Sequence, residues 1–189
     1  KVMVGIDVLF EDGYDLRYLK DKKIGLITNQ TAINREFKST FEILRSPLKN
    51  LNLVALFAPE HGLNGLAYAN EKVMDQNIDG IPLFSLHGQT RRPTKEMLKN
   101  IDVLVYDIQD IGSRSYTYIS TLFYCMEDAA KANIQVIVLD RPNPLNDMIV
   151  DGPLLEEKWR SFVGYINVPY CHGMTIGEYA MMLTGENWL

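Results

Sequence analysis

The sequence predicts an α/β fold with an open, mainly parallel β-sheet that carries helices on both faces. Four apolar runs rich in Val and Ile, at residues 24–28, 53–57, 101–106 and 136–139, are typical of strands that are buried on both sides. Each run leads into a polar cluster, and helical patterns separate the runs. Ligands of such sheets bind beyond the carboxyl ends of the strands, so we expect the polar clusters to meet along one edge.

Length, charge and cysteine content narrow the function classes. A chain of 189 residues usually forms one domain, and we expect a single domain over residues 1–189. The net charge of −5 is spread without a basic run, which argues against nucleic-acid and anionic-membrane partners. No apolar segment reaches the roughly 20 residues of a membrane span. Cys125 and Cys171 lack the spacing of a disulfide framework or zinc finger.

The two ends of the chain look cut. The chain begins at Lys1 rather than Met, without a signal peptide, and stops after a helical pattern at Leu189. A removed targeting segment and a missing downstream domain both fit these ends. The sequence itself therefore predicts neither a localisation nor an oligomeric state.

The first half of the chain contains a strand, a helix and a second strand. Only a weak amphipathic pattern precedes the first strand. Phe37, Phe41 and Leu44 then recur at spacings of four and three residues, which predicts a helix that lies on the sheet and ends at Pro47. The strand at 53–57 follows, so we expect a right-handed crossover between parallel neighbours.

A long irregular segment follows the second strand. Residues 63–80 are polar and lack periodicity, and we expect them to form part of the wall of a site. Residues 81–86 predict a short strand, in which Pro82 favours an edge position or the first residue. A short helix is expected at 93–99.

Two more helices are predicted in the second half of the chain. The stronger one ends near Asn133 and has an apolar stripe made by Tyr118, Leu122, Cys125, Met126 and Ala129. Near the end of the chain, Thr175 and Glu178 have the spacing of a capping box, which predicts a helix over 176–183.

The polar cluster after the second strand holds the leading catalytic candidate. Glu60 follows a buried strand and lies between Phe57 and Leu63, so apolar surroundings would disfavour its charged form and make it a proton donor. His61 would orient Glu60 or a ligand. The structural alternatives are a Glu60 that caps a helix or pairs with an arginine, and a His61 satisfied by the backbone.

The cluster after the strand at 101–106 offers a second carboxylate or sugar-binding groups in Asp107, Gln109 and Asp110. Turn formation and capping are the alternative roles of these residues. Arg114 and Arg141 suit bidentate binding of a substrate carboxylate, against the alternative that they neutralise nearby aspartates.

The remaining candidates would contact a substrate. Asn29, Gln30 and Asn143 could bind hydroxyl or amide groups, or equally hold their own loops. Tyr116 could stack on a sugar ring. His172 precedes the capped helix and could reach the site from the far end.

The common cofactor motifs are missing from the sequence. Neither GxGxxG nor GxxxxGK[ST] is present, and there is no GxSxG elbow. His61, His87 and His172 are available as metal ligands, but no HxH or HExxH pair places two of them together. We therefore expect no cofactor, and a metal-dependent hydrolase is an alternative only.

Seven ordered motifs cover nearly the whole chain. They are GLITNQT at 25–31, FAPEHGL at 57–63, SLHG at 85–88, DIQDIGSR at 107–114 with YTY at 116–118, LDRPNP at 139–144, SFVG at 161–164 and HGMTIGE at 172–178. Together they resemble the NamZ-type exo-β-N-acetylmuramidases, a family long catalogued as a domain of unknown function. His87 and Asn70 depart from the family pattern, in which Tyr and Gly are usual.

The resemblance implies a Rossmann-like catalytic domain, normally followed by a smaller C-terminal domain that this chain lacks. It also implies cofactor-free hydrolysis of terminal β-1,4-linked N-acetylmuramic acid at the non-reducing ends of peptidoglycan fragments. The family's proposed catalytic glutamate corresponds to Glu60. A periplasmic or secreted location follows from that substrate alone.

The expected reaction uses Glu60 as general acid, with Asp107 or Asp110 as the second group unless the 2-acetamido group of the sugar replaces them. We expect Arg114 or Arg141 to pair with the lactyl carboxylate that distinguishes muramic acid from glucosamine. The competing hypotheses are a saccharide-binding domain without turnover and a metal-dependent hydrolase.

Overall fold

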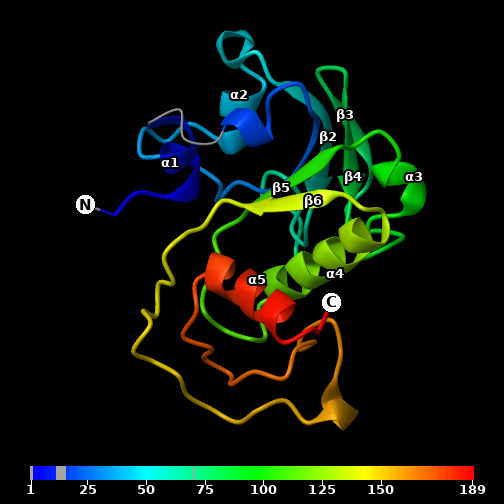
Figure 1. The fold of residues 1–189 in the computed structure, drawn as a ribbon. Coiled ribbons are helices and arrows are strands. Elements are labelled where there is room, and N and C mark those ends of the chain that lie inside the picture. The colour runs from blue at the N-terminus through cyan, green and yellow to red at the C-terminus, as the bar shows by residue number, and fades with distance from the viewer. Residues whose placement is uncertain (1, 12–15, 70) are drawn as a thin grey trace.

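A six-stranded sheet forms the centre of the computed structural model, which describes residues 2–11, 16–69 and 71–189 (Figure 1). Asn70, noted above as a departure from the family pattern, lies outside the described residues. The strand order is β3-β4-β2-β1-β5-β6, and only the β3–β4 pair is antiparallel. The strands are β1 (Lys23–Thr28), β2 (Asn52–Ala58), β3 (Gln76–Ile78), β4 (Ile81–Ser85), β5 (Val103–Asp107) and β6 (Gln135–Val138).

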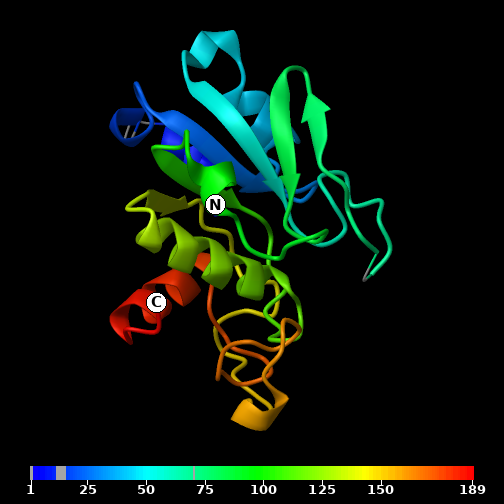
Figure 2. The ribbon, with the colours of Figure 1, turned by 90° about the vertical axis from the view of Figure 1, so that its right-hand side faces the viewer.

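Helices cover both faces of this sheet, so the predicted fold class is confirmed (Figures 1 and 2). One core cluster joins the sheet to α1 and α2, and the other joins it to α3, α4 and α5. The helices are α1 (Gly5–Glu11), α2 (Thr40–Leu44), α3 (Lys95–Leu98), α4 (Tyr118–Lys131) and α5 (Ile176–Gly185), with short 3₁₀ turns at Leu16–Tyr18, Pro47–Lys49 and Glu157–Trp159. None of the helices among the described residues has the length and apolar character needed to cross a membrane.

The parallel register brings the carboxyl ends of the strands to one level. Thr28 at the end of β1 pairs with Asp107 at the end of β5, and Ala58 at the end of β2 pairs with Ser85 at the end of β4. The segments that follow β1, β2, β4 and β5 therefore leave the sheet side by side, as the sequence predicts for polar clusters that build one site.

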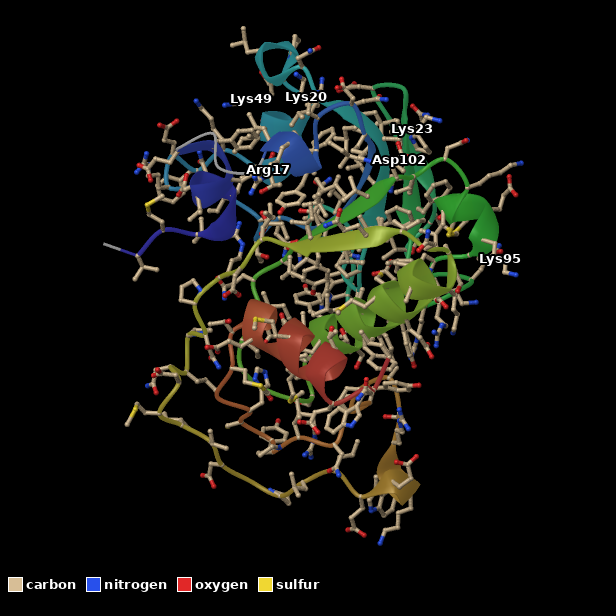
Figure 3. The ribbon with its side chains drawn as sticks, in the orientation of Figure 1. Arg17, Lys20, Lys23, Lys49, Lys95 and Asp102 are labelled. Atoms are coloured by element: carbon tan, nitrogen blue, oxygen red, sulfur yellow. The ribbon has the colours of Figure 1, made fainter. Side chains whose placement is uncertain are left out.

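At the amino ends of the strands, a side-chain hydrogen bond links β1 to the start of β5. The Lys23 N–H donates to Asp102 Oδ2 over 2.8 Å, and Figure 3 shows the two residues next to each other at the amino ends of β1 and β5. The candidate site residues from the sequence follow the carboxyl ends of the strands instead.

The predicted start of the helix that carries Phe41 and Leu44 was wrong, because Phe37 lies outside it. Helix α2 begins only at Thr40, and Phe37 is 83% exposed with a left-handed φ of 61°. The reason is a capping box: Ser39 accepts from the Glu42 N–H while the Glu42 carboxylate accepts from the Ser39 N–H.

The segment at 63–80 is irregular as predicted, except for the short strand β3 at its end. This strand pairs with β4, so the predicted edge position for Pro82 was wrong. Pro82 is tolerated because the pairing of β4 with β2 starts one residue later, at Leu83, and needs no Pro82 N–H. Helix α1 was also not predicted.

Helices α4 and α5 agree with the sequence. Helix α4 ends at Lys131, two residues before Asn133, and α5 starts after the predicted cap, in which Thr175 accepts from the Glu178 N–H. Between β6 and α5, residues 139–175 form a long excursion that extends away from the sheet in both ribbon views (Figures 1 and 2).

Candidate active site

A pocket of about 490 Å³ lies where the segments after β2, β4 and β5 converge. Its lining combines polar groups with aromatic rings and comes from four parts of the chain. The lining residues are Glu60, His61, Ala69, His87, Arg91, Ser115, Tyr116, Thr117, Tyr118, Phe162 and Val163. Three predicted site residues, Glu60, His61 and Tyr116, thus share this pocket.

A larger hollow, of about 620 Å³, lies beside β6 and α1. Its walls are mainly apolar, and Arg141 is the only candidate from the sequence that lines it. Size alone does not identify the site, because the candidate proton donor lies in the smaller pocket.

Glu60 is held inside the pocket by a residue of the α4 cap. Its side chain is nearly buried, and its Oε2 accepts a hydrogen bond of 2.7 Å from the Thr117 hydroxyl. Thr117 is the N-cap residue of α4 but makes no side-chain capping bond, since its hydroxyl is used on Glu60. This contact fixes one carboxyl oxygen. The other, Oε1, lies 3.6 Å from His87 Nε2.

His87 is a site residue that sequence reasoning noted only as a departure from the family pattern and as a potential metal ligand. Burial lowers the pKa of its imidazole, and nearby Arg91 acts in the same direction while Glu60 opposes it. Its Nδ1 is buried and has no hydrogen-bond partner among the described residues. The signal that could have found it is its position directly after a strand end, the same position that singled out Glu60.

His61 is bound to the backbone, which is the alternative to a catalytic role that the sequence left open. Its Nδ1 lies 2.9 Å from the Ala67 carbonyl, and its φ of 70° turns the chain sharply after β2. The His61 ring therefore holds the loop that starts at residue 63. His61 also lines the pocket.

Two tyrosines form an aromatic side of the pocket. The rings of Tyr116 and Tyr118 meet edge to face, with centroids 4.8 Å apart. Burial raises the pKa of Tyr118, so its phenol stays protonated and acts only as a hydrogen-bonding group. Tyr116 is less buried and offers the surface on which a sugar ring can stack.

Asp107 and Arg141 form a buried ion pair away from this pocket. Arg141 Nε donates to Asp107 Oδ1 over 2.5 Å and Nη2 donates to Oδ2 over 3.1 Å, while the Thr40 hydroxyl also donates to Asp107. Burial raises the pKa of Asp107 although Arg141 counteracts it. Arg141 Nη2 further donates to the Ile33 carbonyl. The geometry supports the alternative in which Arg141 neutralises Asp107.

Asp110 and His172 form a second buried pair. His172 Nε2 lies 3.2 Å from Asp110 Oδ2, which also accepts from the Gly112 N–H. The Met174 N–H lies 3.3 Å from His172 Nδ1, which favours the tautomer with the proton on Nε2. The pair joins the turn after β5 to the segment before α5.

Arg114 and Asn143 hold the excursion at 139–175 in place. Arg114 Nη1 donates to the carbonyls of Pro153 and Val168 over 2.6 and 2.5 Å. Asn143 Nδ2 donates to the Met174 carbonyl over 3.0 Å. Both side chains donate to backbone carbonyls, and neither lines the pocket around Glu60.

The candidate residues with amide side chains also make contacts within the loops. Asn29 Oδ1 accepts from both the backbone and the hydroxyl of Thr31, and Gln109 Nε2 donates to the carbonyls of Asp110 and Pro142. The exposed Gln30 packs over Gly65, where an added Cβ would lie 2.4 Å from its amide carbon. These three residues shape the loops around the site.

The comparisons with known proteins place the chain in a family. Residues 24–189 match the family model described as exo-β-N-acetylmuramidase NamZ, N-terminal. The chain belongs to this family. It is 48% identical to the peptidoglycan β-N-acetylmuramidase NamZ of Bacillus subtilis (strain 168), over 98% of the chain and 45% of that protein.

Two solved structures are similar to this chain in both fold and sequence. A DUF1343 family protein from Bacteroides fragilis has a TM-score of 0.87 and 49% identity, over 99% of this chain and 47% of its own. A second one from the same organism has a TM-score of 0.82 and 36% identity, over 100% of this chain and 48% of its own. The chain thus spans about half the length of these relatives.

No three His, Cys, Asp or Glu side chains converge in a metal-binding arrangement within the part of the chain that the structure describes. The pocket brings together Glu60, Thr117 and His87, with aromatic rings around them.

Proposed function

We propose that this chain is a glycosidase domain that releases terminal β-1,4-linked N-acetylmuramic acid from the non-reducing ends of peptidoglycan fragments. Membership of the NamZ family supports the substrate class. The single observation that carries the chemistry is the nearly buried Glu60 carboxyl group, held by Thr117 in a pocket with aromatic sides. A periplasmic or secreted location follows from this substrate as part of the proposal.

Glu60 is the proton donor in the proposed reaction. The carboxyl group transfers its proton to the glycosidic oxygen as the bond between that oxygen and the anomeric carbon breaks. Thr117 keeps one carboxyl oxygen fixed, and the other, which lies beside His87, is the one that transfers the proton. His87 beside that oxygen is kept neutral by burial and thus adds no competing positive charge.

The second catalytic group is the acetamido group of the sugar itself. Glu60 is the one carboxylate among the described residues that line the pocket, and Asp107 is committed to its ion pair with Arg141. The acetamido oxygen therefore bonds to the anomeric carbon as the leaving sugar departs. Water then opens this ring and gives its proton to the Glu60 carboxylate, which restores the acid.

The test is turnover of a disaccharide in which N-acetylmuramic acid is β-1,4-linked to N-acetylglucosamine. Because a general acid contributes about 10²- to 10⁴-fold, Glu60→Gln should lower kcat by a factor in that range while sugar binding persists. Glu96→Gln on the exposed face of α3 is the matched control and should leave kcat unchanged.

Two outcomes would contradict the proposal. Binding of the disaccharide by the wild type without release of free sugar would indicate a saccharide-binding domain. Loss of turnover with EDTA and its recovery with zinc would indicate a metal-dependent hydrolase.

A further inference from the structure

Arg91 is the one arginine among the described residues that line the pocket around Glu60. No ion pair between Arg91 and a carboxylate of the described residues is present. The next residue, Arg92, is by contrast held by Glu127 and Asp128 on α4. Arg91 therefore brings an uncompensated positive charge to the rim of the pocket.

An aromatic stack fixes the position of Arg91. Its guanidinium carbon lies 4.4 Å from the ring centre of Phe162, and Phe162 in turn stacks on Tyr124 of α4 at 5.8 Å and 24°. Arg92 covers Tyr124 at 4.5 Å. A guanidinium that stacks through its flat face keeps the N–H donors in its plane available for an anion.

His87 provides a second, independent sign of a ligand in the same place. Its ring centre lies 6.0 Å from that of Phe162, and the charge of Arg91 contributes to lowering its pKa, which places the two side chains within electrostatic reach. The buried Nδ1 of His87 has no partner among the described residues. Because an unsatisfied buried polar atom is costly, a ligand or water should occupy the adjacent space.

We propose that Arg91 binds the lactyl carboxylate of N-acetylmuramic acid and so makes the pocket prefer this sugar to N-acetylglucosamine, an inference that rests on the proposed function. The two sugars differ by this one anionic substituent. Its negative charge must leave water for the pocket, and the positive charge of Arg91 at the rim offsets the cost of that desolvation. This role was expected for Arg114 or Arg141, whose guanidinium donors are used on carbonyls and on Asp107.

The experiment compares binding of three methyl β-glycosides by calorimetry. The sugars are N-acetylmuramic acid, the lactyl methyl ester of the same sugar, and N-acetylglucosamine. A charge-assisted fork at an exposed position should contribute about tenfold in Kd. Arg91→Gln should therefore weaken binding of the acid about tenfold and leave the ester and N-acetylglucosamine unchanged.

Two further variants control for structural effects. Arg91→Lys should recover part of the affinity for the acid, since it keeps the charge but not the planar fork. Arg160→Gln removes a comparable arginine that covers Tyr165 outside the pocket, and it should change none of the three affinities.

Several results would overturn the role of Arg91. These are a wild type that does not bind the acid more tightly than its ester, an Arg91→Gln variant with the wild-type preference, and an equal loss for all three sugars. Because binding is measured without turnover, a protein that binds the acid through Arg91 but releases no sugar would refute only the proposed hydrolysis.

Discussion

The environment of Glu60 is built by residues that are far apart in the sequence. Thr117 comes from the start of α4 and holds one carboxyl oxygen, while His87 comes from the segment after β4 and lies beside the other. Phe162 contacts His87 from the excursion at 139–175. Glu60 therefore depends on three separate parts of the chain for its surroundings.

The lowered pKa of His87 gives a pH dependence of stability. Because burial keeps the folded-state pKa below that of the unfolded chain, the unfolded chain binds a proton that the folded one does not. Stability due to the neutral ring is therefore fully present above a pH of about 6.5 and is lost as the pH falls below that value.

The change that tests this dependence is His87→Tyr, which removes the titratable ring. Urea unfolding at neutral pH and at a pH of about 5 should show a smaller loss of unfolding free energy in the variant than in the wild type. An identical loss in both proteins would mean that other groups control the acid sensitivity.

Of the residues that line the pocket, Glu60, His61 and Tyr116 were candidates from the sequence, whereas Arg91 and Phe162 were not. Glu60 could be identified because a polar residue after a buried strand reaches the ligand-binding edge. Arg91 and Phe162 lie on connections without periodicity, and their path to the pocket depends on packing that no local pattern encodes. The sequence likewise left open whether Arg141 binds a substrate carboxylate or neutralises an aspartate, because the choice depends on packing. The structure pairs Arg141 with Asp107.

At the scale of elements, the strands and the two long helices follow local signals. Buried runs specify β1, β2 and β5, and an apolar stripe specifies α4. The start of α2 was missed because the apolar spacing that includes Phe37 competes with the capping box at Ser39, which decides the boundary. Strand β3 is short and exposed, and only its partner strand defines it.

The N-terminus of α5 is joined by a hydrogen bond to the segment that follows β6. Thr175 Oγ1 accepts from the Glu178 N–H and donates to Asp140 Oδ2 over 2.8 Å, and Asp140 follows β6. Thr175→Ala should lower the unfolding free energy by about 1–2 kcal/mol, the range of a lost N-cap. Thermal or urea unfolding measures this loss.

Two related variants complete the comparison. Thr175→Ser should retain most of the stability because it keeps the hydroxyl, and Thr184→Ala at the exposed end of α5 is the matched control. If Thr175→Ala were as stable as the control, the cap would contribute nothing to the docking of α5.

At the scale of the whole molecule, buried polar pairs join the excursion at 139–175 to the sheet. Arg141 connects this segment to Asp107 at the end of β5 and to the Ile33 carbonyl before α2. Asp110 and His172 make a second connection. The candidate active site depends on them because the excursion carries Phe162 to the pocket.

The ion pair between Asp107 and Arg141 therefore has a structural role that stability measurements can test. Asp107→Asn and Arg141→Met should each cost about 3–5 kcal/mol, because each leaves a buried group without its partner. The double variant Asp107→Leu/Arg141→Met should lose less than the sum of the two single changes. Arg45→Met, which breaks the exposed pair with Asp79, should cost at most about 1 kcal/mol.

A catalytic role for Asp107 would give the opposite pattern. In that case Asp107→Asn would unfold at the same urea concentration as the wild type but lose turnover of the muramic-acid disaccharide. The two readings of this residue are thus separated by comparing stability with rate in one variant.

The central claim is that Glu60 protonates the leaving group, and its most direct test varies that group. The rates of the wild type and Glu60→Gln are compared on the disaccharide and on a dinitrophenyl glycoside of N-acetylmuramic acid, whose phenolate departs without a proton. The account predicts a loss of about 10²- to 10⁴-fold on the disaccharide and a far smaller loss on the dinitrophenyl glycoside. An equal loss on both substrates, or no loss on either, would contradict it.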